Sequence, residues 1–496
     1  MNKDTCQAQR VVARCGKLPG AYPSLDQAPY HPGELYPEFP GGSVSVKPNL
    51  VFGQVRDVLA DLGLDQEHFG TSAWNPLGAL VAPGAKIVVK PNWVLHRNEG
   101  PGGTDCLITH AAVLRAVLDY VLLAKPREVV VGDAPIQDCD FEALLALGSR
   151  AVVDYFAGHG FPVRLVDFRR TVLSVSGGKW EVRENMKPLD QYVTVDLGSE
   201  SLLEPISADA DHFRVTKYDP RLMRPHHQPG RHRYLIARDV LEADLVVNLP
   251  KLKTHKKAGL TAALKNLVGI NGNKEYLPHH RKGSAGQGGD NYDRFSLLKW
   301  LAEQVEDLAN RHRDKSAFYG FCQKLNYGLL VMNMKMGGDG EVEGSWWGND
   351  TVWRMCLDLN RVLLYADQQG VLQNGPMRRI LSIADAVVAG EGEGPLKSTP
   401  YAMNVILGSL NPAAADWLAA LLMGLDPEKL PIINHAFHLS GRPLASYPPS
   451  DLDCRMNGQS VSLSSLRPVG PGARPARGWL GHCERAITSE NVTPLC

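Results

Sequence analysis

The sequence predicts an α/β fold: a Rossmann-like, mostly parallel sheet in two lobes, with an active-site cleft between the lobes. Short apolar runs alternate with segments of helical periodicity, a pattern typical of a parallel sheet that helices cover on both faces. Several of these runs end in polar turns, which is where sheets of this kind place their sites. At 496 residues and 44% hydrophobic side chains, the chain is long enough to bury a large core.

Six short runs of β-branched and aliphatic residues are predicted as strands because they are continuous and bounded by turn residues. They lie at residues 86–90, 128–131, 163–167, 245–248, 329–332 and 405–407. Longer segments with apolar residues at helical spacing are predicted as helices. These lie at residues 111–124, 141–158, 260–268, 296–312, 352–365 and 412–423.

The other segments indicate how the chain is organised. Residues 1–50 and 441–496 are rich in turn-forming residues and are predicted as an irregular N-terminal arm and an irregular C-terminal tail. Residues 51–440 form the predicted α/β domain with its two lobes. Within it, the polar stretch 170–240, which contains a basic cluster, is expected to be an insertion or cap.

Charge and cysteine content argue against several classes of protein. Lys plus Arg and Asp plus Glu each total 53, and this neutral balance disfavours a nucleic-acid binder, whose affinity rests on neutralising phosphates. No apolar run reaches the roughly 18–20 residues that span a bilayer, and the first residues lack the apolar core of a signal peptide. The nine cysteines form no C-x-x-C motif, which predicts reduced thiols, a cytoplasmic protein and no Fe–S cluster.

The segment from Asn248 to Lys274 carries the strongest chemical signal. Five lysines and one histidine fall between Lys251 and Lys265, and such a cluster repels itself unless an anion offsets it. A helix is expected to begin near Gly259, where its free N–H groups would also attract an anion. The alternative is a solvated basic loop before a helix. The candidate anion-binding residues are Lys251, Lys253, Thr254, Thr261 and Asn266, and the candidate catalytic residues are His255 and Lys265.

Two polar turns lie after the first predicted strand. Lys90 and Asn92 follow it directly, and Thr104 and Asp105 lie in the next loop, before a predicted helix. None of the four has an obvious apolar role, so they are further candidates for binding a hydroxyl-rich anion. An ordinary polar loop is the alternative interpretation.

A carboxylate cluster follows the second predicted strand. Asp133 ends that strand, where it could orient His255 or bind a cation. Asp138 and Asp140 follow it, and the three oxygen ligands together could hold Mg²⁺ or Ca²⁺. The alternative is that Asp138 or Asp140 caps the next helix.

A glycine-rich turn follows a later apolar run. So many glycines predict that the backbone approaches another group closely there. The two glutamates argue against phosphate and favour hydroxyls, an amine or a metal. The turn consists of Gly390, Glu391, Gly392, Glu393 and Gly394.

Taken in order, these motifs resemble the domain-of-unknown-function 362 family. The set is K-P-N, T-D, V-V-V-G-D, N-L-P-K-L-K-T-H…A-L-K-N-L-V-G, G-E-G-E-G-P and N-P-A-A-A-D, between about residues 85 and 430. Many relatives carry a ferredoxin-type Fe–S module. This chain has no C-x-x-C, so that module and its electron transfer are not implied here.

A more distant resemblance is to nickel-dependent lactate racemase. The segment from His255 to Lys265, H-K-K-A-G-L-T-A-A-L-K, is similar to the racemase segment H-x-x-A-G-x-S-G-G-x-K. There the His and Lys act at the active site, and the Lys holds a nickel-pincer nucleotide. Ala262 and Ala263 replace the glycine pair, and the D-x-T-R motif is not found. The resemblance implies a shared two-lobed fold and makes the nickel-pincer nucleotide a candidate cofactor, beside a divalent cation.

These observations predict an enzyme that acts on a small anionic, oxygen-rich substrate by His/Lys acid–base chemistry, of the isomerase, racemase or lyase class. His255 is expected to be the general acid or base, because the ordinary pKa of histidine lies near neutrality. Lys265 is expected to fix the anion, hold a cofactor or act as a second acid or base. Two alternatives remain open: a redox or racemase-type enzyme with a nucleotide cofactor, and a non-catalytic protein that binds anions or polysaccharide precursors.

Overall fold

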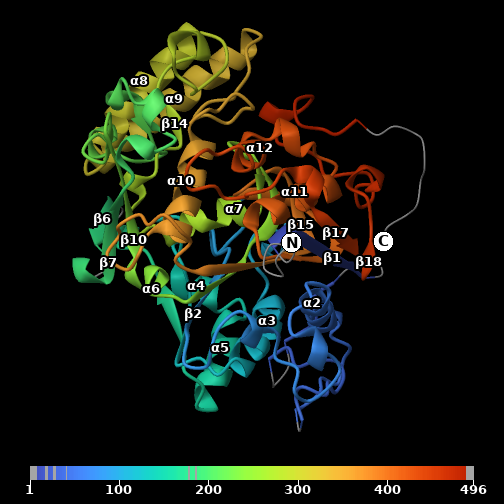
Figure 1. The fold of residues 1–496 in the computed structure, drawn as a ribbon. Helices are drawn as coiled ribbons and strands as arrows, with labels where there is room; N and C mark the ends of the chain where they lie inside the picture. Colours follow the sequence, from blue (N-terminus) through green and yellow to red (C-terminus); the bar gives the residue numbers. More distant parts are fainter. Residues whose placement is uncertain are drawn as a thin grey trace.

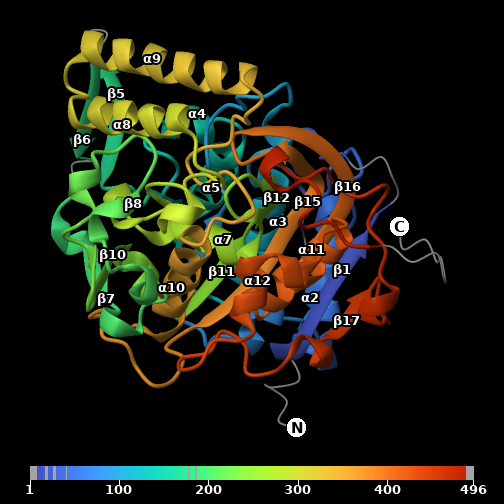
Figure 2. The same ribbon diagram turned by 90° about the horizontal axis from the view of Figure 1, so that it is seen from above.

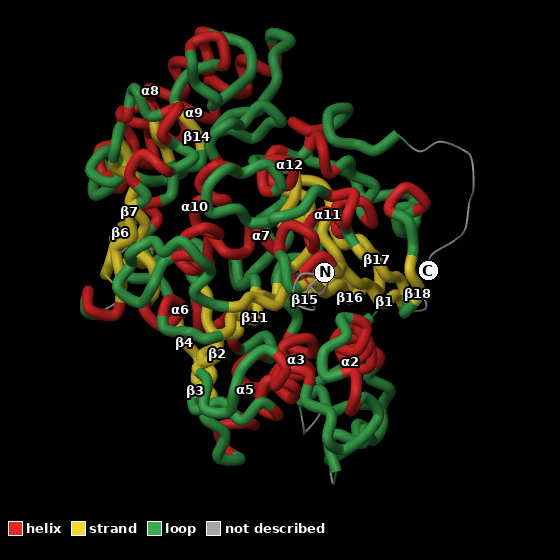
Figure 3. Tube along the Cα trace, in the orientation of Figure 1, coloured by secondary structure: helices red, strands yellow, loops and turns green. Residues whose placement is uncertain are grey.

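One large sheet forms the centre of the computed structural model, and helices cover both of its faces (Figure 1, Figure 3). The structure describes residues 8–16, 21–25, 29–40, 42–176, 179–184 and 187–486. Over these residues the sheet is mixed and mostly parallel, which confirms the predicted α/β class. The arrangement in two lobes with a cleft between them stays a prediction.

The central sheet has 11 strands within the described ranges, in the order β18-β17-β1-β16-β15-β11-β2-β3-β4, with β12 paired to β15 and β13 to β12. Five of the six predicted strands lie in it. Its strands are β1 Arg10–Cys15, β2 Lys86–Pro91, β3 Glu128–Asp133, β4 Val163–Asp167, β11 Leu245–Leu249, β12 Lys251–His255, β13 Gly259–Thr261, β15 Arg379–Glu393, β16 Lys397–Ser409, β17 Asp453–Met456 and β18 Gln459–Ser460.

Side chains of the central strands alternate between two hydrophobic cores, as the period of a strand requires. Val88 of β2 belongs to one core and Val89 to the other. In Figure 1, α2, α3 and α5 lie below the sheet, and α7, α10, α11 and α12 lie above it. The helices are α2 Leu50–Asp61, α3 Ala111–Leu123, α4 Phe141–Leu145, α5 Ser149–Gly158, α6 Arg238–Leu241, α7 Ala263–Asn266, α8 Leu297–Arg311, α9 Ser316–Lys335, α10 Val352–Tyr365, α11 Pro412–Leu422 and α12 Pro431–Ala436.

The predicted insertion at 170–240 forms small sheets outside the central one. One of them also uses a strand from beyond residue 240. They are β5 Thr171–Ser176 with β6 Lys179–Glu184, β7 Tyr192–Asp196 with β10 Arg231–Ala237 and β9 His227–Gln228, and β8 Phe213–Arg214 with β14 His280–Arg281. Figure 2 shows the antiparallel pair α8 and α9 beside this region, with α9 at the outer edge.

Two predicted elements are wrong. The apolar run at 329–332 lies inside the 20-residue helix α9, which continues through Gly328 without a break. The helix predicted at 260–268 begins instead as β13, which pairs antiparallel with β12, and only the four residues of α7 follow as α-helix, before the 3₁₀ helix Leu267–Ile270. The predicted helix at 141–158 is divided at Gly148, whose φ of 123° leaves the helical region.

The two chain ends are more ordered than predicted. Within the arm at 1–50, β1 pairs with β16 and β17 in the central sheet, and α2 begins at Leu50. Within the tail at 441–496, β17 and β18 extend the same sheet. Cys15 is disulfide-bonded, so reduced thiols are a wrong expectation for that residue. Over the described part of the chain, no helix combines the length and apolar character needed to cross a bilayer.

Candidate functional site

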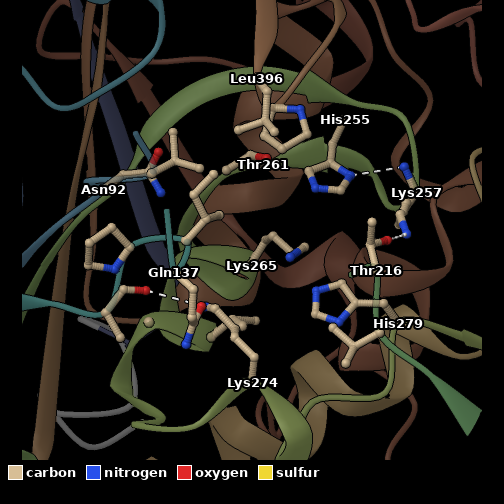
Figure 4. A pocket seen from close by; sticks show the side chains of 18 of the residues that line it. Asn92, Gln137, Thr216, His255, Lys257, Thr261, Lys265, Lys274, His279 and Leu396 are labelled. Atoms are coloured by element: carbon tan, nitrogen blue, oxygen red, sulfur yellow. Dashed lines mark hydrogen bonds between the residues drawn. The ribbon is translucent and has the colours of Figure 1, made fainter. Parts of the chain in front are cut away.

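A cavity of about 240 Å³ opens beyond the carboxyl ends of β2 and β3 and is bordered by Lys253 and His255 of β12. Figure 4 shows His255, Lys265 and His279 directed into it. The predicted site residues that line the cavity are Asn92, Asp133, Asp138, Lys253, His255, Thr261, Lys265 and Asn266. Those that do not line it are Lys90, Thr104, Asp105, Asp140, Lys251, Thr254 and the glycine-rich turn 390–394.

Backbone groups fix the two cavity histidines in opposite tautomers. His255 Nδ1 accepts hydrogen bonds from the backbone N–H groups of Lys257 and Ala258, at 3.0 and 3.1 Å, so the ring proton lies on Nε2. His279 Nδ1 lies 2.7 Å from the carbonyl oxygen of Leu277, which can only accept, so Nε2 of that ring has a free lone pair. Burial first, and then the positive charge of Lys265, hold the pKa of both histidines well below the ordinary value. The cavity therefore contains one neutral donor and one neutral acceptor.

Lys265 extends from α7 into the space between the two rings (Figure 4). The N-terminus of α7 is already occupied: Asp416 accepts from the backbone N–H groups of Ala263 and Leu264, at 2.5 and 3.1 Å. The predicted anion site at free N–H groups near Gly259 is therefore wrong. Gly259 itself lies in β13 with φ +75°, packed against Leu430.

Three further lysines bring positive charge to the cavity. Lys253 donates to Asn92 Oδ1 at 2.9 Å, Lys257 to Thr216 Oγ1 at 3.1 Å, and Lys274 to the carbonyl of Ala134 at 3.4 Å. Burial lowers the pKa of Lys253 to about 7, with the neighbouring Lys251 adding to the shift. It lowers the pKa of Lys257 and of Lys274 to about 8. A bound anion would stabilise the charged form of each.

Buried polar atoms without partners also face this cavity. Both amide atoms of Gln137, Nε1 of Trp93 and Oγ1 of Thr261 lack a hydrogen-bond partner among the described residues. All three residues line the cavity, and Gln137 and Thr261 are 97% buried. Leaving such groups unsatisfied costs about 1–3 kcal/mol each, so the arrangement favours a bound molecule or waters rich in oxygen.

Asp133 lies at the floor of the cavity, where an ion pair and hydrogen bonds from the backbone fix its position. Its Oδ1 lies 2.8 Å from Lys90 Nζ, and the backbone N–H groups of Trp93 and Ala134 donate to the same carboxylate at 2.7 and 2.8 Å. Burial raises the pKa of Asp133 and lowers that of Lys90, while the attraction between them opposes both shifts. Backbone N–H groups, and not Asp133, orient His255, which corrects the predicted role of this aspartate.

Lys251 lies in a separate buried cluster. Its Nζ is 3.0 Å from Asp385 Oδ2 and donates to the Tyr22 hydroxyl. The Tyr22 hydroxyl donates to Asp385 Oδ1 at 2.6 Å, and its ring stacks on His110. The pairing of β12 with β15 shifts register between Lys251 and Lys253, which places the two lysines in different surroundings. Lys251, a candidate anion-binding residue from the sequence, therefore does not line the cavity that His255 and Lys265 share.

The glycine-rich turn approaches the chain's own backbone. A Cβ at Gly394 would lie 2.0 Å from the carbonyl oxygen of Thr254, and Thr254 Oγ1 donates to the carbonyl of Gly392 at 2.9 Å. The carboxylates of Glu391 and Glu393 accept backbone N–H groups of the C-terminal segment, at 2.8 Å each. The close approach is confirmed, but its partners are β12 and the C-terminal segment rather than a ligand.

The predicted cation site at Asp133, Asp138 and Asp140 does not form. Asp140 caps α4, where its Oδ1 accepts from the backbone N–H of Ala143 at 3.0 Å. Asp138 Oδ2 lies 3.7 Å from Lys217 Nζ. Among the residues that the structure describes, no three His, Cys, Asp or Glu side chains are grouped closely enough to hold a metal ion.

Sequence reasoning missed several residues of the cavity. His279 and Gln137 lie in loops and Lys274 begins a short 3₁₀ helix, and only the fold brings these residues to β12. Lys257 was part of the basic cluster but had no assigned role. Glu343 faces Lys257 across Thr216, whose hydroxyl donates to Glu343 Oε2 at 3.1 Å. A histidine pair at 279–280 is the one local signal for this set, and nothing in the sequence connects it to His255.

The model of the family described as "Domain of unknown function (DUF362)" matches residues 87–421. No curated protein matches this chain. Among solved structures, the crystal structure of a protein from Thermotoga maritima is similar, with 10% identity over 72% of this chain and a TM-score of 0.29. The match spans 55% of that protein, so this chain covers little more than half of its length. A likeness at this level carries no argument about function.

Proposed function

Since the chain belongs to the DUF362 family, whose name assigns no reaction, we propose a function from the cavity itself. The protein is an enzyme that moves a proton on a small anionic, oxygen-rich substrate, of the isomerase, racemase or lyase class. The observation that carries this proposal is the pair of neutral imidazoles with opposite tautomers on either side of Lys265.

His279 is the proposed base. Its Nε2 lone pair takes a proton from carbon next to a carbonyl or carboxylate, and the electron pair of that C–H bond moves onto the substrate oxygen. His255 Nε2–H donates a hydrogen bond to that oxygen as its negative charge develops, and Lys265 faces the same space. A neutral imidazole can donate this hydrogen bond at neutral pH, so the site needs no strongly acidic group for this role. Return of the proton to carbon completes an isomerisation.

The rest of the cavity selects the substrate. Lys253, Lys257 and Lys274 are placed to hold an anionic group. Gln137 and Thr261 have unpartnered polar atoms for hydroxyl or carbonyl oxygens. The volume of about 240 Å³ lies below the roughly 300–1,000 Å³ of sites for drug-sized ligands, which favours a small metabolite.

The volume of the cavity favours a small substrate alone over a nickel-pincer nucleotide together with a substrate. The proposed chemistry therefore uses only side chains of this chain.

Thermal-shift screening of small carboxylates and phosphates tests the anion site. Ligands that raise the melting temperature of the wild type should raise that of Lys265→Ala much less. They should raise the melting temperature of Lys315→Ala as much as that of the wild type, because Lys315 is exposed and lies outside the cavity. Each stabilising ligand is then incubated with the protein in D₂O. An enzyme should place deuterium at the carbon next to the carbonyl, whereas a non-catalytic binding protein should bind without exchange. Identical anion responses of the wild type and Lys265→Ala would overturn the site.

A further inference from the structure

The α8–α9 hairpin is apolar on its outside. Of the 26 large apolar side chains that are exposed within the described ranges, twelve lie between residues 295 and 336. Tyr327 and Met336 are each 71% exposed and Phe321 is 61% exposed. The set is Phe295, Leu297, Trp300, Leu301, Leu308, Phe318, Phe321, Leu325, Tyr327, Met332, Met334 and Met336. Helical spacing places Tyr327 and Met334 on the side of α9 opposite Phe318, Phe321 and Met336, so we call the surface formed by the other ten residues the outer face.

The inside of the same hairpin is polar. Glu303, Asp307 and Asn310 of α8 are buried, and Glu306 accepts hydrogen bonds from Gln323 and Asn326 of α9 at 2.9 and 2.8 Å. A second cavity, of about 180 Å³, lies among these side chains. Arg214 of β8 anchors the hairpin through Asp307, with two hydrogen bonds of 2.8 and 2.9 Å. Apart from a small apolar cluster of Ala309, Tyr319 and Cys322, the usual arrangement of a surface helix, apolar inside and polar outside, is thus reversed.

The size of the outer face marks it as an interaction surface. Taking roughly 200 Å² for a fully exposed large side chain, the ten residues of the outer face leave on the order of 1,000 Å² of apolar surface in water. The largest apolar patch on a typical monomer measures about 300–600 Å².

The exposed charges on these two helices are all basic. Arg311, Lys324 and Lys335 are exposed and form no ion pair with any described residue. The three carboxylates of α8 turn inward, and α9 contains no Asp or Glu. A contact with a second copy through this face would bring the basic side chains of the two copies together. The charge pattern instead complements an anionic surface.

We infer that the outer face binds in the plane of a lipid bilayer that contains anionic headgroups. Aromatic and aliphatic side chains beside lysines are the composition of helices that lie at such an interface. Lysines next to the apolar face can extend to the headgroups while their stems lie along the lipid. The helix α9 lies at the outer edge of the molecule, where a flat surface can reach it (Figure 2). This inference is independent of the proposed reaction.

Flotation with vesicles tests the inference on the full-length protein. Vesicles of phosphatidylcholine alone and of phosphatidylcholine with 30% phosphatidylglycerol are the two probes. We expect binding to the anionic vesicles, weaker binding to the neutral ones, and release by salt. Phe321→Asp should weaken binding at least about tenfold, because it removes a large apolar contact. Leu189→Asp, at a side chain that is likewise 61% exposed but outside the hairpin, should bind like the wild type.

The double variant Lys324→Glu, Lys335→Glu keeps the apolar residues and tests the charges. Two lysines near an anionic surface contribute roughly 1 kcal/mol each, so this variant should lose at least about tenfold in affinity for anionic vesicles only. Failure of the wild type to float with either vesicle would overturn the inference. So would a stable dimer in light scattering that Phe321→Asp converts to monomer, because the outer face would then belong to a second copy.

Discussion

Replacing Gly269 by alanine is expected to destabilise the protein by about 3–5 kcal/mol, the cost of breaking a buried ion pair. A Cβ at this position would lie 1.8 Å from Asp133 Oδ1 and 2.8 Å from Lys90 Nζ. Both side chains are buried, so neither can swing into solvent. The carboxylate must move, and it then loses both Lys90 and the N–H groups of Trp93 and Ala134.

Unfolding in guanidinium chloride measures this effect. Gly286→Ala is the matched control, because Gly286 is exposed and nothing lies within 4 Å of a Cβ there. It should change the free energy of unfolding by no more than about 0.5 kcal/mol. If the free energy of unfolding of Gly269→Ala is lower by less than about 1 kcal/mol, the Lys90–Asp133 pair can move to accommodate the methyl group, and the account of the cavity floor is refuted.

Three further predictions follow from the same structure. The pKa values of Lys257 and Lys274 are lowered to about 8, so raising the pH from 7 to 9 should weaken anion binding by about tenfold for each lysine that contacts the ligand. Calorimetry should show that the protein takes up protons when it binds the anion near pH 8. An anion affinity that does not change with pH would contradict this prediction. Burial raises the pKa of Asp416 to about 8, so between about pH 4 and 8 the folded chain holds a proton that the unfolded chain has lost, and the free energy of unfolding should fall as the pH rises through that window. In urea unfolding, Asp416→Asn should remove this part of the pH dependence of the unfolding free energy. An unchanged pH dependence in the variant would contradict the prediction. Anaerobically purified protein should contain no stoichiometric iron and acid-labile sulfide, because no two of the nine cysteines lie within three residues of each other; stoichiometric sulfide would show this to be wrong.

Local patterns predicted much of the sheet, because its central strands are short valine-rich runs that are buried on both faces. The runs at 86–90 and 245–248 became β2 and β11, paired in parallel from Leu245 opposite Ile87. The run at 329–332 is similarly apolar but belongs to α9. Periodicity cannot separate a short apolar strand from part of a helix, and α9 carries apolar side chains on several sides, so it has no clear amphipathic pattern.

The candidate site was predicted where neighbours in sequence stay neighbours in space. His255, Thr261 and Lys265 share the cavity because β12, β13 and α7 follow one another directly. Lys251 does not line the cavity because the pairing of β12 with β15 shifts register between Lys251 and Lys253. Amino-acid composition gives no sign of such a shift. His279 joined the group through a long-range fold contact, and its role as an acceptor depends on one backbone carbonyl, that of Leu277.

The rate at which the variants His279→Gln and His255→Gln exchange the substrate's carbon-bound hydrogen for deuterium tests most directly the claim that His279 is the base and His255 the hydrogen-bond donor. The substrate is whichever small anion stabilises the wild type and exchanges its carbon-bound hydrogen in D₂O. The account predicts that either substitution lowers the exchange rate by roughly 10²–10⁴-fold, while the thermal stabilisation by the anion, which rests on the lysines, is largely kept. Exchange at the wild-type rate in His279→Gln would contradict the account, because the base would then be another group.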